Sequence, residues 1–121
     1  DSKRKGIFPW GTQWPPPPRA GNYGDRQWYS PTDLKGYDDG DRFTAPVGSF
    51  ERNALGIYDL SGNVYEWCED EYRPGENKRV MRGAAFNSRA QGRLLSAERI
   101  YFEPENRAAN HGFRCVLTLK N

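Results

Sequence analysis

Residues 56–70 read GIYDLSGNVYEWCED and gather oxygen-bearing side chains around one turn. Asp59, Asn63 and Glu66 lie close to Gly62, which is more polar chemistry than an ordinary hairpin requires. The carboxylates can cap and hydrogen-bond the turn itself. That role alone does not explain why one turn carries two carboxylates and an amide.

A second oxygen-rich stretch comes earlier, where Asp38, Asp39, Gly40 and Asp41 follow one another. Such a cluster is most simply a turn, because Asp and Gly accept the backbone conformations that turns require. Its carboxylates and loop carbonyls also match what calcium selects, although the roughly twelve-residue ligand spacing of an EF-hand is absent. The sequence therefore favours a turn and leaves a cation site as the alternative.

Short extended segments must hold these turns in place. Residues 55–59 and 63–68 are predicted strands on either side of a turn at 60–62. Further strands are predicted at 78–86, 92–99 and 112–119. No long stretch keeps a helical period, although 90–99 fits either a helix or a strand. The pattern predicts a β-rich fold with long loops.

The first third of the chain is rich in Pro and Gly, with consecutive prolines at 15–18. Consecutive prolines favour an extended segment without a backbone ladder. A linker or a proline-rich ligand of an SH3-type domain is one interpretation. Trp10 and Trp14 favour the other, a loop anchored in a core, because large aromatic rings gain most from burial.

Length and composition restrict the class of protein. With 121 residues the chain suits one domain with its own core. Lys and Arg number 18 against 16 Asp and Glu, the net charge is +2, and the two signs are interspersed, so no nucleic-acid partner is expected. No apolar run reaches the ~20 residues that span a bilayer, and no signal or transmembrane segment is recognisable in this chain, so membrane insertion is not expected. The compartment is undetermined, and Cys68 and Cys115 can be bridged or free.

Several motifs together resemble one protein family. They are FPWG (8–11), GNY (21–23), TAPVGSFERNALGIYDLSGNVYEWCEDEY (44–72), RVMRGAAF (79–86) and GFRCV (112–116). Their order resembles the formylglycine-generating enzyme family, also called sulfatase-modifying factors. The resemblance covers nearly the whole chain, and the pattern N-x-x-G-I-Y-D-L-x-G-N-V-x-E-W is a specific part of it.

This resemblance implies an α+β fold that is mostly irregular. The expected architecture is a variant of the C-type lectin fold, with a small antiparallel sheet and long calcium-stabilised loops. Residues 1–121 would form a single domain that corresponds to the C-terminal portion of the family domain. Within it, residues 1–54 would be wrapping loops, and 55–121 would be a sheet core with a variable loop at 87–111.

The resemblance also assigns ligands to calcium, the structural cofactor it implies. In the family, the residues matching Asp59 and Glu66 give side-chain oxygens to the ion, and those matching Gly62 and Val64 give backbone carbonyls. Asn63 is expected to brace the turn instead. The alternative that the two carboxylates only cap the turn stays open. A second family site maps onto Asn22 and Asp39 by side chain and onto Tyr23 and Asp41 by carbonyl.

The family's oxidation of a sulfatase cysteine to formylglycine implies a copper(I) ion held by two cysteines. Soft copper(I) needs thiolates, but the matching positions here are Ser88 and Arg93, and the assisting serine is Ala85. Cys68 and Cys115 match structural positions of the family. Copper is therefore not expected, and no catalytic residue is assigned.

Residues 87–111 match the segment that binds ligands in the variable proteins of bacterial diversity-generating retroelements. Aromatic, amide and charged side chains suit recognition, although ordinary loops are polar too. His111 is the only histidine and is predicted to lie on the surface of a loop. The residues predicted to bind a ligand are Asn87, Arg89, Gln91, Arg93, Glu98, Tyr101, Phe102 and His111.

The first hypothesis is thus a non-catalytic, calcium-stabilised module that binds a protein or small-molecule ligand, with the retroelement variable proteins as one version. The alternative is a formylglycine-generating oxidase, or another family enzyme, whose site is completed by an N-terminal half. A third possibility is that this segment is purely architectural within a larger domain. The sequence does not predict an oligomeric state.

Overall fold

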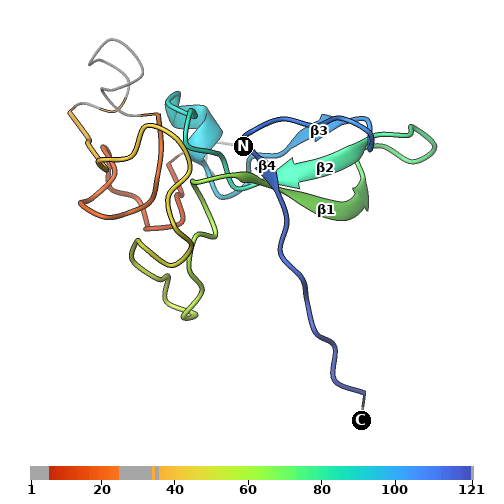
Figure 1. The fold of residues 1–121 in the computed structure, drawn as a ribbon, viewed down its shortest axis with the longest axis horizontal. Helices are drawn as coiled ribbons and strands as arrows, with labels where there is room; N and C mark the ends of the chain where they lie inside the picture. Colours follow the sequence, from red (N-terminus) through yellow and green to blue (C-terminus); the bar gives the residue numbers. More distant parts are fainter. Residues whose placement is uncertain (1–5, 25–33, 35, 121) are drawn as a thin grey trace.

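The regular structure is one small sheet surrounded by loops (Figure 1). The computed structural model describes residues 6–24, 34 and 36–120. Its elements are the strands β1 (Tyr65–Glu71), β2 (Arg79–Arg82), β3 (Ile100–Phe102) and β4 (His111–Gly112), with the 3-10 helix η2 (Gln91–Leu94) between β2 and β3. The expectation of an irregular fold with little helix is confirmed.

The sheet is mixed, whereas an antiparallel sheet is the expectation from the sequence. Its strand order is β3-β2-β1-β4. β1 pairs antiparallel with β2, and β2 pairs antiparallel with β3, but β4 runs parallel to β1. The chain after β3 crosses to the far edge of the sheet before it pairs again. The parallel pair is close, because a Cβ on Gly112 would lie 2.6 Å from the Val64 Cγ2 atom.

The predicted strand at 55–59 is wrong. This segment is a series of turns, with Gly56 at φ +78° and Asp59 at φ +50°, and a left-handed backbone cannot continue an extended strand. The side chain of Asn53 organises the turns, since its Oδ1 accepts hydrogen bonds from the backbone N–H groups of Leu55 and Ile57 at 2.9 and 3.0 Å.

Other predicted strands have different bounds. The strand expected at 63–68 begins at Tyr65 and runs to Glu71, and the one expected at 78–86 ends at Arg82, because Gly83 (φ +96°) and Ala84 (φ +60°) turn the chain. The strand predicted at 92–99 is wrong, since η2 and turns fill this range and the strand begins only at Ile100.

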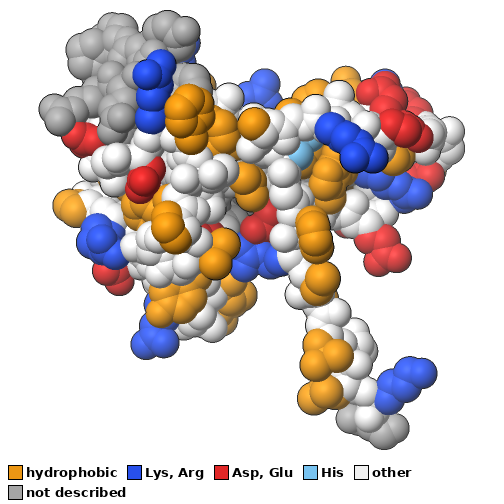
Figure 2. All heavy atoms as spheres, viewed as in Figure 1, with side chains coloured by type: hydrophobic (Ala, Val, Ile, Leu, Met, Phe, Trp, Pro, Cys, Tyr) orange, Lys and Arg blue, Asp and Glu red, His pale blue; other side chains and the backbone are white. Residues whose placement is uncertain are grey.

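The strand predicted at 112–119 is also wrong for most of its length. Pairing with the sheet ends at Gly112, and residues 113–120 are exposed and carry no regular structure. Figure 1 shows this C-terminal segment leading away from the rest of the molecule, and Figure 2 shows hydrophobic side chains along it. Its exposed large hydrophobic residues are Phe113, Val116, Leu117 and Leu119.

The core is largely aromatic. Phe8, Tyr23, Tyr37 and Tyr65 are buried together with Met81 of β2, and smaller buried residues fill the space between them. The rings of Phe8 and Trp10 stack with their centroids 5.0 Å apart, and Trp14 packs against the same cluster. Residues 6–24 are therefore anchored by their aromatic side chains, as in the loop interpretation. Among the described residues, no helix has the length or the apolar character to cross a bilayer.

Candidate functional site

The 59–66 turn closes around a small pocket of about 390 Å³. Asp59, Gly62, Val64 and Glu66 all line it, so the structure brings together the residues predicted for the first calcium site. Asp59, Gly62 and Asn63 each have positive φ, which curls the backbone around the pocket. Besides these residues, the pocket is lined by Val47, Gly48, Tyr58, Phe113 and Arg114.

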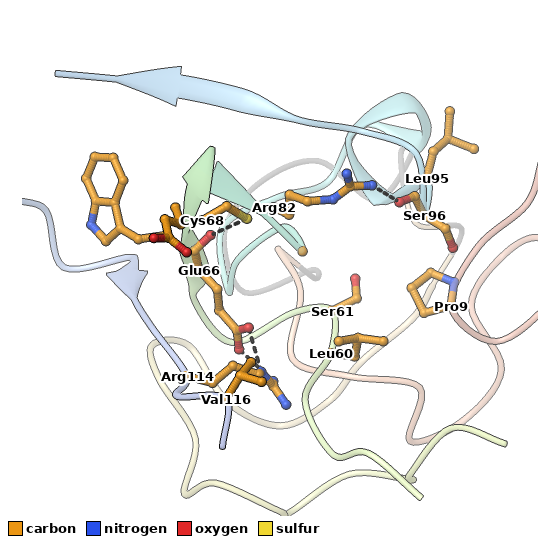
Figure 3. Close-up of a pocket in the computed structure, with 13 residues that line it drawn as sticks. Pro9, Leu60, Ser61, Glu66, Cys68, Arg82, Leu95, Ser96, Arg114 and Val116 are labelled. Carbon is orange, nitrogen blue, oxygen red and sulfur yellow. Dashed lines mark hydrogen bonds and ion pairs between the residues drawn. The ribbon is translucent and has the colours of Figure 1, made fainter. Parts of the chain in front are cut away.

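The guanidinium group of Arg114 already supplies a positive charge at this pocket. It donates to both carboxylate oxygens of Glu66, Nε to Oε2 and Nη2 to Oε1, each at 2.6 Å (Figure 3). It also donates to the backbone carbonyls of Tyr58 at 3.1 Å and Asp59 at 2.7 Å. The hydrogen bonds to Glu66 raise the pKa of Arg114. The side chain of Asp59 is engaged too, because its Oδ2 accepts from the Gly48 N–H at 2.6 Å. A calcium ion at Glu66 would therefore meet a carboxylate that already binds a cationic group through both oxygens.

At the second predicted calcium site, the side-chain oxygen of Asn22 accepts no hydrogen bond from the described residues. Asn22 is fully buried, and its Nδ2 donates to the Phe43 carbonyl at 2.7 Å and to Asn63 Oδ1 at 3.2 Å. Its Oδ1 has no hydrogen-bond partner among the described residues. A buried acceptor without a partner is rare in folded proteins, and a cation would satisfy it. Asp39 lies beside it, accepting from the backbone N–H groups of Tyr23 at 2.7 Å and Asp41 at 2.9 Å.

These donors suit calcium better than a softer metal. An amide oxygen, a carboxylate and backbone carbonyls are hard ligands. Within residues 6–24, 34 and 36–120, no group of three or more His, Cys, Asp and Glu side chains converges on one point. A calcium ion at this site would be held by Asn22 Oδ1, the Asp39 carboxylate and backbone carbonyls, and the unpartnered, buried Asn22 Oδ1 fits such an ion.

Asn63 connects the two candidate calcium sites. Its Oδ1 accepts from Asn22 Nδ2 and from the Ala45 N–H at 2.8 Å, and its Nδ2 donates to the Ala45 carbonyl at 3.2 Å. Its backbone N–H donates to the Asn22 carbonyl at 2.8 Å, and its carbonyl accepts from Phe86 at 2.9 Å. The interpretation that Asn63 braces the turn holds, and the structure adds that this side chain joins three separate loops.

A wider pocket of about 790 Å³, here named the recognition pocket, lies over β3 and the 87–90 loop. It gathers six of the residues predicted to bind a ligand, Asn87, Arg89, Arg93, Glu98, Tyr101 and Phe102. Its other lining residues are Tyr65, Tyr72, Ser88, Ala90, Arg99, Ile100 and Asn110.

Gln91 and His111 do not line the recognition pocket. Gln91 is exposed at the start of η2. His111 is half-buried and begins β4, so its expected place on a loop surface is wrong. Its ring packs against Trp67, with centroids 5.7 Å apart, and against Phe102 at 5.0 Å. This burial lowers the pKa of His111.

The positions that match the copper cysteines both lie in the recognition pocket and are engaged in other ways. Ser88 is buried, its Oγ accepting from the Ala85 N–H at 3.0 Å and donating to the Tyr65 hydroxyl at 3.1 Å. Arg93 forms an ion pair with Glu98 at 2.7 Å. The residues lining this pocket include no cysteine.

Both cysteines are free and lie elsewhere. Cys68 lines a third pocket of about 630 Å³, together with Glu66, Arg82 and Arg114 (Figure 3). Burial raises the pKa of the Cys68 thiol. Cys115 is exposed in the C-terminal segment. The sequence allows Cys68 and Cys115 to be bridged or free, and in the structure both are free thiols.

Sequence reasoning missed an aromatic and cationic cluster at the edge of the recognition pocket. The rings of Tyr72 and Tyr101 lie with their centroids 4.2 Å apart. Arg99 lies over the Tyr72 ring at 4.7 Å, and Lys78 lies over the Tyr101 ring at 5.0 Å. Tyr72 lies 15 residues before the predicted binding segment, which begins at 87. It comes close to Tyr101 because β2 pairs with both β1 and β3, and this pairing is not visible in the sequence.

Comparison with known proteins adds the following. The sulfatase-modifying factor enzyme 1-like domain family matches residues 2–119. An inactive C-alpha-formylglycine-generating enzyme 2 from Mus musculus is 36% identical over 116 residues, covering 91% of this chain and 36% of the relative. A formylglycine-generating enzyme from Bos taurus is 31% identical over 128 residues, covering 91% of this chain and 33% of the relative. The chain thus spans about a third of the length of the curated relatives it matches.

Solved structures agree with this relationship. PvdO from Pseudomonas aeruginosa superposes with a TM-score of 0.60 at 29% identity, over 77% of this chain and 37% of that chain. Treponema denticola variable protein 1 superposes with a TM-score of 0.57 at 24% identity, over 78% of this chain and 34% of that chain, which shows a shared fold. From the match over residues 2–119 and these identities, the chain belongs to the sulfatase-modifying factor enzyme 1-like family, as its motifs indicate.

Proposed function

We propose that this chain is a non-catalytic binding module of its family, stabilised by calcium, which takes a protein or small-molecule ligand in the recognition pocket. The observation that carries the proposal is the chemistry at the positions matching the copper cysteines. A neutral, hydrogen-bonded Ser88 and a permanently cationic Arg93 replace two soft anionic ligands there. The printed name of the Mus musculus relative, an inactive formylglycine-generating enzyme, supports the same proposal.

The competing function is formylglycine generation, and a peptide assay separates the two. The purified protein is incubated with copper(I), oxygen and a Cys-x-Pro-x-Arg peptide, and mass spectrometry follows the conversion of cysteine to formylglycine. We expect no conversion above a reaction without protein. Conversion would overturn the proposal and direct attention to Cys68 and Cys115 as copper ligands.

A matched variant tests the residue assignment behind this proposal. The double substitution Ser88→Cys with Arg93→Cys places thiols at both matching positions. Competition with a copper(I) chelator is expected to show tighter copper(I) binding by the double variant than by the original chain. Equal binding by the two proteins would mean that these positions do not face a common metal, and the argument from Ser88 and Arg93 would fail.

Calcium stabilisation is tested by thermal unfolding. Because calcium would bind the folded state, saturating calcium at about 100 times its dissociation constant should add about 2.7 kcal/mol to the free energy of unfolding. We expect a higher melting temperature in calcium than in EDTA, and a smaller difference after Asp39→Asn, which keeps the side-chain shape but removes a carboxylate. Asp70→Asn, an exposed site on β1, is the control. An unchanged melting temperature in calcium would contradict this part of the proposal.

A further inference from the structure

The recognition pocket includes a partly exposed tyrosine ring packed against a second tyrosine ring, with planes 37° apart. Tyr101 is 43% exposed, although its ring lies 4.2 Å from that of Tyr72. Tyr101 lies on β3 and Tyr72 immediately follows β1, so two separate segments of the sheet hold the pair. An exposed tyrosine supported by a second ring is a rigid platform that loses little entropy when another ring stacks on it.

Arg99 adds a fixed cationic group beside this platform. Its guanidinium carbon lies over the Tyr72 ring, 4.7 Å from the ring centroid. Within the part of the chain that the structure describes, Arg99 makes no hydrogen bond and no ion pair. A cation–π contact does not engage the N–H groups of a guanidinium as hydrogen-bond donors to another residue, so those of Arg99 are able to bind a carboxylate, sulfate or phosphate in a bidentate way.

The charged residues that line the pocket are mostly basic. It consists of Arg89, Arg93 and Arg99 against the single carboxylate of Glu98. That carboxylate is bound to Arg93 at 2.7 Å and is therefore not directed at Arg99. The acidic residues at the end of β1, Glu69, Asp70 and Glu71, do not line the pocket.

We propose that the recognition pocket binds anionic aromatic ligands, in which a flat ring stacks on Tyr101 and an attached carboxylate, sulfate or phosphate pairs with Arg99. This inference rests on the proposed binding function and names the ligand class for it. The ring and the charge both contribute, because Tyr101 supplies the stacking surface and Arg99 supplies charge-assisted hydrogen bonds. Lys78, over the Tyr101 ring at 5.0 Å, adds positive charge beside the stacked ring.

A set of four small probes separates the two requirements. The probes are 2-naphthoate, which has both ring and anion, 2-naphthylmethanol, which has the ring alone, acetate, which has the anion alone, and 2-naphthylmethylammonium, which reverses the charge. Each is titrated into the isotope-labelled protein, and amide chemical shifts give the site and the dissociation constant. We expect 2-naphthoate to bind about 5-fold or more tighter than the neutral probe, as for one partly solvated charge-assisted hydrogen bond. The largest shifts should lie around Tyr72, Arg99 and Tyr101.

Variants assign the effect to the named side chains. Arg99→Gln should remove the preference for 2-naphthoate over the neutral probe, while Tyr101→Ala should weaken every naphthyl probe. Arg107→Gln, at an exposed position outside the pocket, should change nothing. Arg99→Lys keeps the charge without the planar donors and should give an intermediate preference. The amide spectrum of each variant also reports whether it is folded.

Several results would overturn the inference. These are equal affinity for the anionic and neutral probes, a preference for the ammonium probe, an Arg99→Gln variant that keeps the preference, or no shifts at the pocket amides. Each of them would leave the binding function itself standing if the peptide assay still shows no formylglycine. Conversion of the peptide would instead overturn the proposed function, whatever the probes do.

Discussion

Arg114 binds Glu66 through both carboxylate oxygens, with both donor to acceptor distances at 2.6 Å. The pair connects the segment that follows β4 to the beginning of β1, and the same guanidinium donates to the carbonyls of Tyr58 and Asp59. Glu66 and Asp59 are the carboxylates that the family resemblance assigns to calcium. Arg114 and a metal ion would therefore compete for the Glu66 carboxylate.

The first prediction concerns this competition. Arg114→Gln removes the guanidinium and leaves the Glu66 carboxylate for a metal ion. We expect the variant to lose about 1 kcal/mol of stability in EDTA, because the pair is partly exposed and solvent weakens it. Calcium should bind the variant about 5-fold tighter by isothermal titration calorimetry, the factor that matches about 1 kcal/mol. Arg107→Gln is the control at an exposed arginine. Unchanged calcium affinity in Arg114→Gln would show that calcium does not use Glu66.

The second prediction compares two glycines with similar backbone angles. Gly62 has φ +84° and Gly75 has φ +80°, so Ala at either position is strained by about 1–2 kcal/mol. A Cβ on Gly62 would also lie 2.7 Å from the Asn22 carbonyl oxygen, whereas a Cβ on Gly75 meets nothing within 4 Å. We expect Gly62→Ala to cost about 1–3 kcal/mol more than Gly75→Ala in urea unfolding. Equal costs would mean that the loop holding Asn22 moves away without penalty.

The third prediction concerns Asn63. Replacing it with Ala removes its hydrogen bonds to Asn22 and Ala45 and leaves a buried backbone N–H without an acceptor. At about 1 kcal/mol for each of the three bonds, and about 1 kcal/mol for the strained φ of +67° in Ala, we expect a loss of about 4 kcal/mol in urea unfolding. Asn63→Gly accepts this φ, so it should recover about 1 kcal/mol of the loss. A loss below about 1 kcal/mol in the Ala variant would mean that the hydrogen bonds of Asn63 to Asn22 and Ala45 contribute little to stability.

The fourth prediction concerns pH. Burial lowers the folded-state pKa of His111 below its unfolded value of about 6.5. The unfolded chain then binds more protons between these two pKa values, so the stability contributed by neutral His111 is present above pH ~6.5 and is lost as the pH falls toward the folded pKa. Melting temperatures measured from neutral to mildly acidic pH should fall less in His111→Phe, which keeps an aromatic ring between Trp67 and Phe102. An identical pH dependence in the two proteins would exclude His111 as the group responsible.

The sequence predicts the residues that meet at a local turn better than it predicts which distant segments pair. The motif around Gly62 was sufficient to bring Asp59, Val64 and Glu66 to one pocket, because the turn that gathers them lies within eight residues of sequence. Arg114 was missed, since its approach to Glu66 depends on the parallel pairing of β4 with β1. That pairing joins segments far apart in the chain.

The same distinction applies to the recognition pocket. The segment at 87–111 includes many of the lining residues, but Tyr72 and Tyr65 come from the region of β1. The failed strand at 55–59 has a local cause instead. Its apolar residues suggest extension, yet Gly56 and Asp59 adopt positive φ and the Asn53 side chain closes the turns. Alternation of residue types carries no information on these backbone angles.

The exposed C-terminal segment has a consequence for how the protein behaves at high concentration. Beyond Gly112, the backbone of 113–120 makes no hydrogen bond to any other described residue, and Phe113, Val116, Leu117 and Leu119 face solvent. An exposed apolar segment whose backbone donors and acceptors are unpaired can pair with another copy of the chain and promote aggregation. A net charge of only +2 gives little mutual repulsion between copies. Solubility, more than melting temperature, is therefore expected to limit work with this chain, and charged substitutions at Val116 or Leu117 are the natural way to improve it.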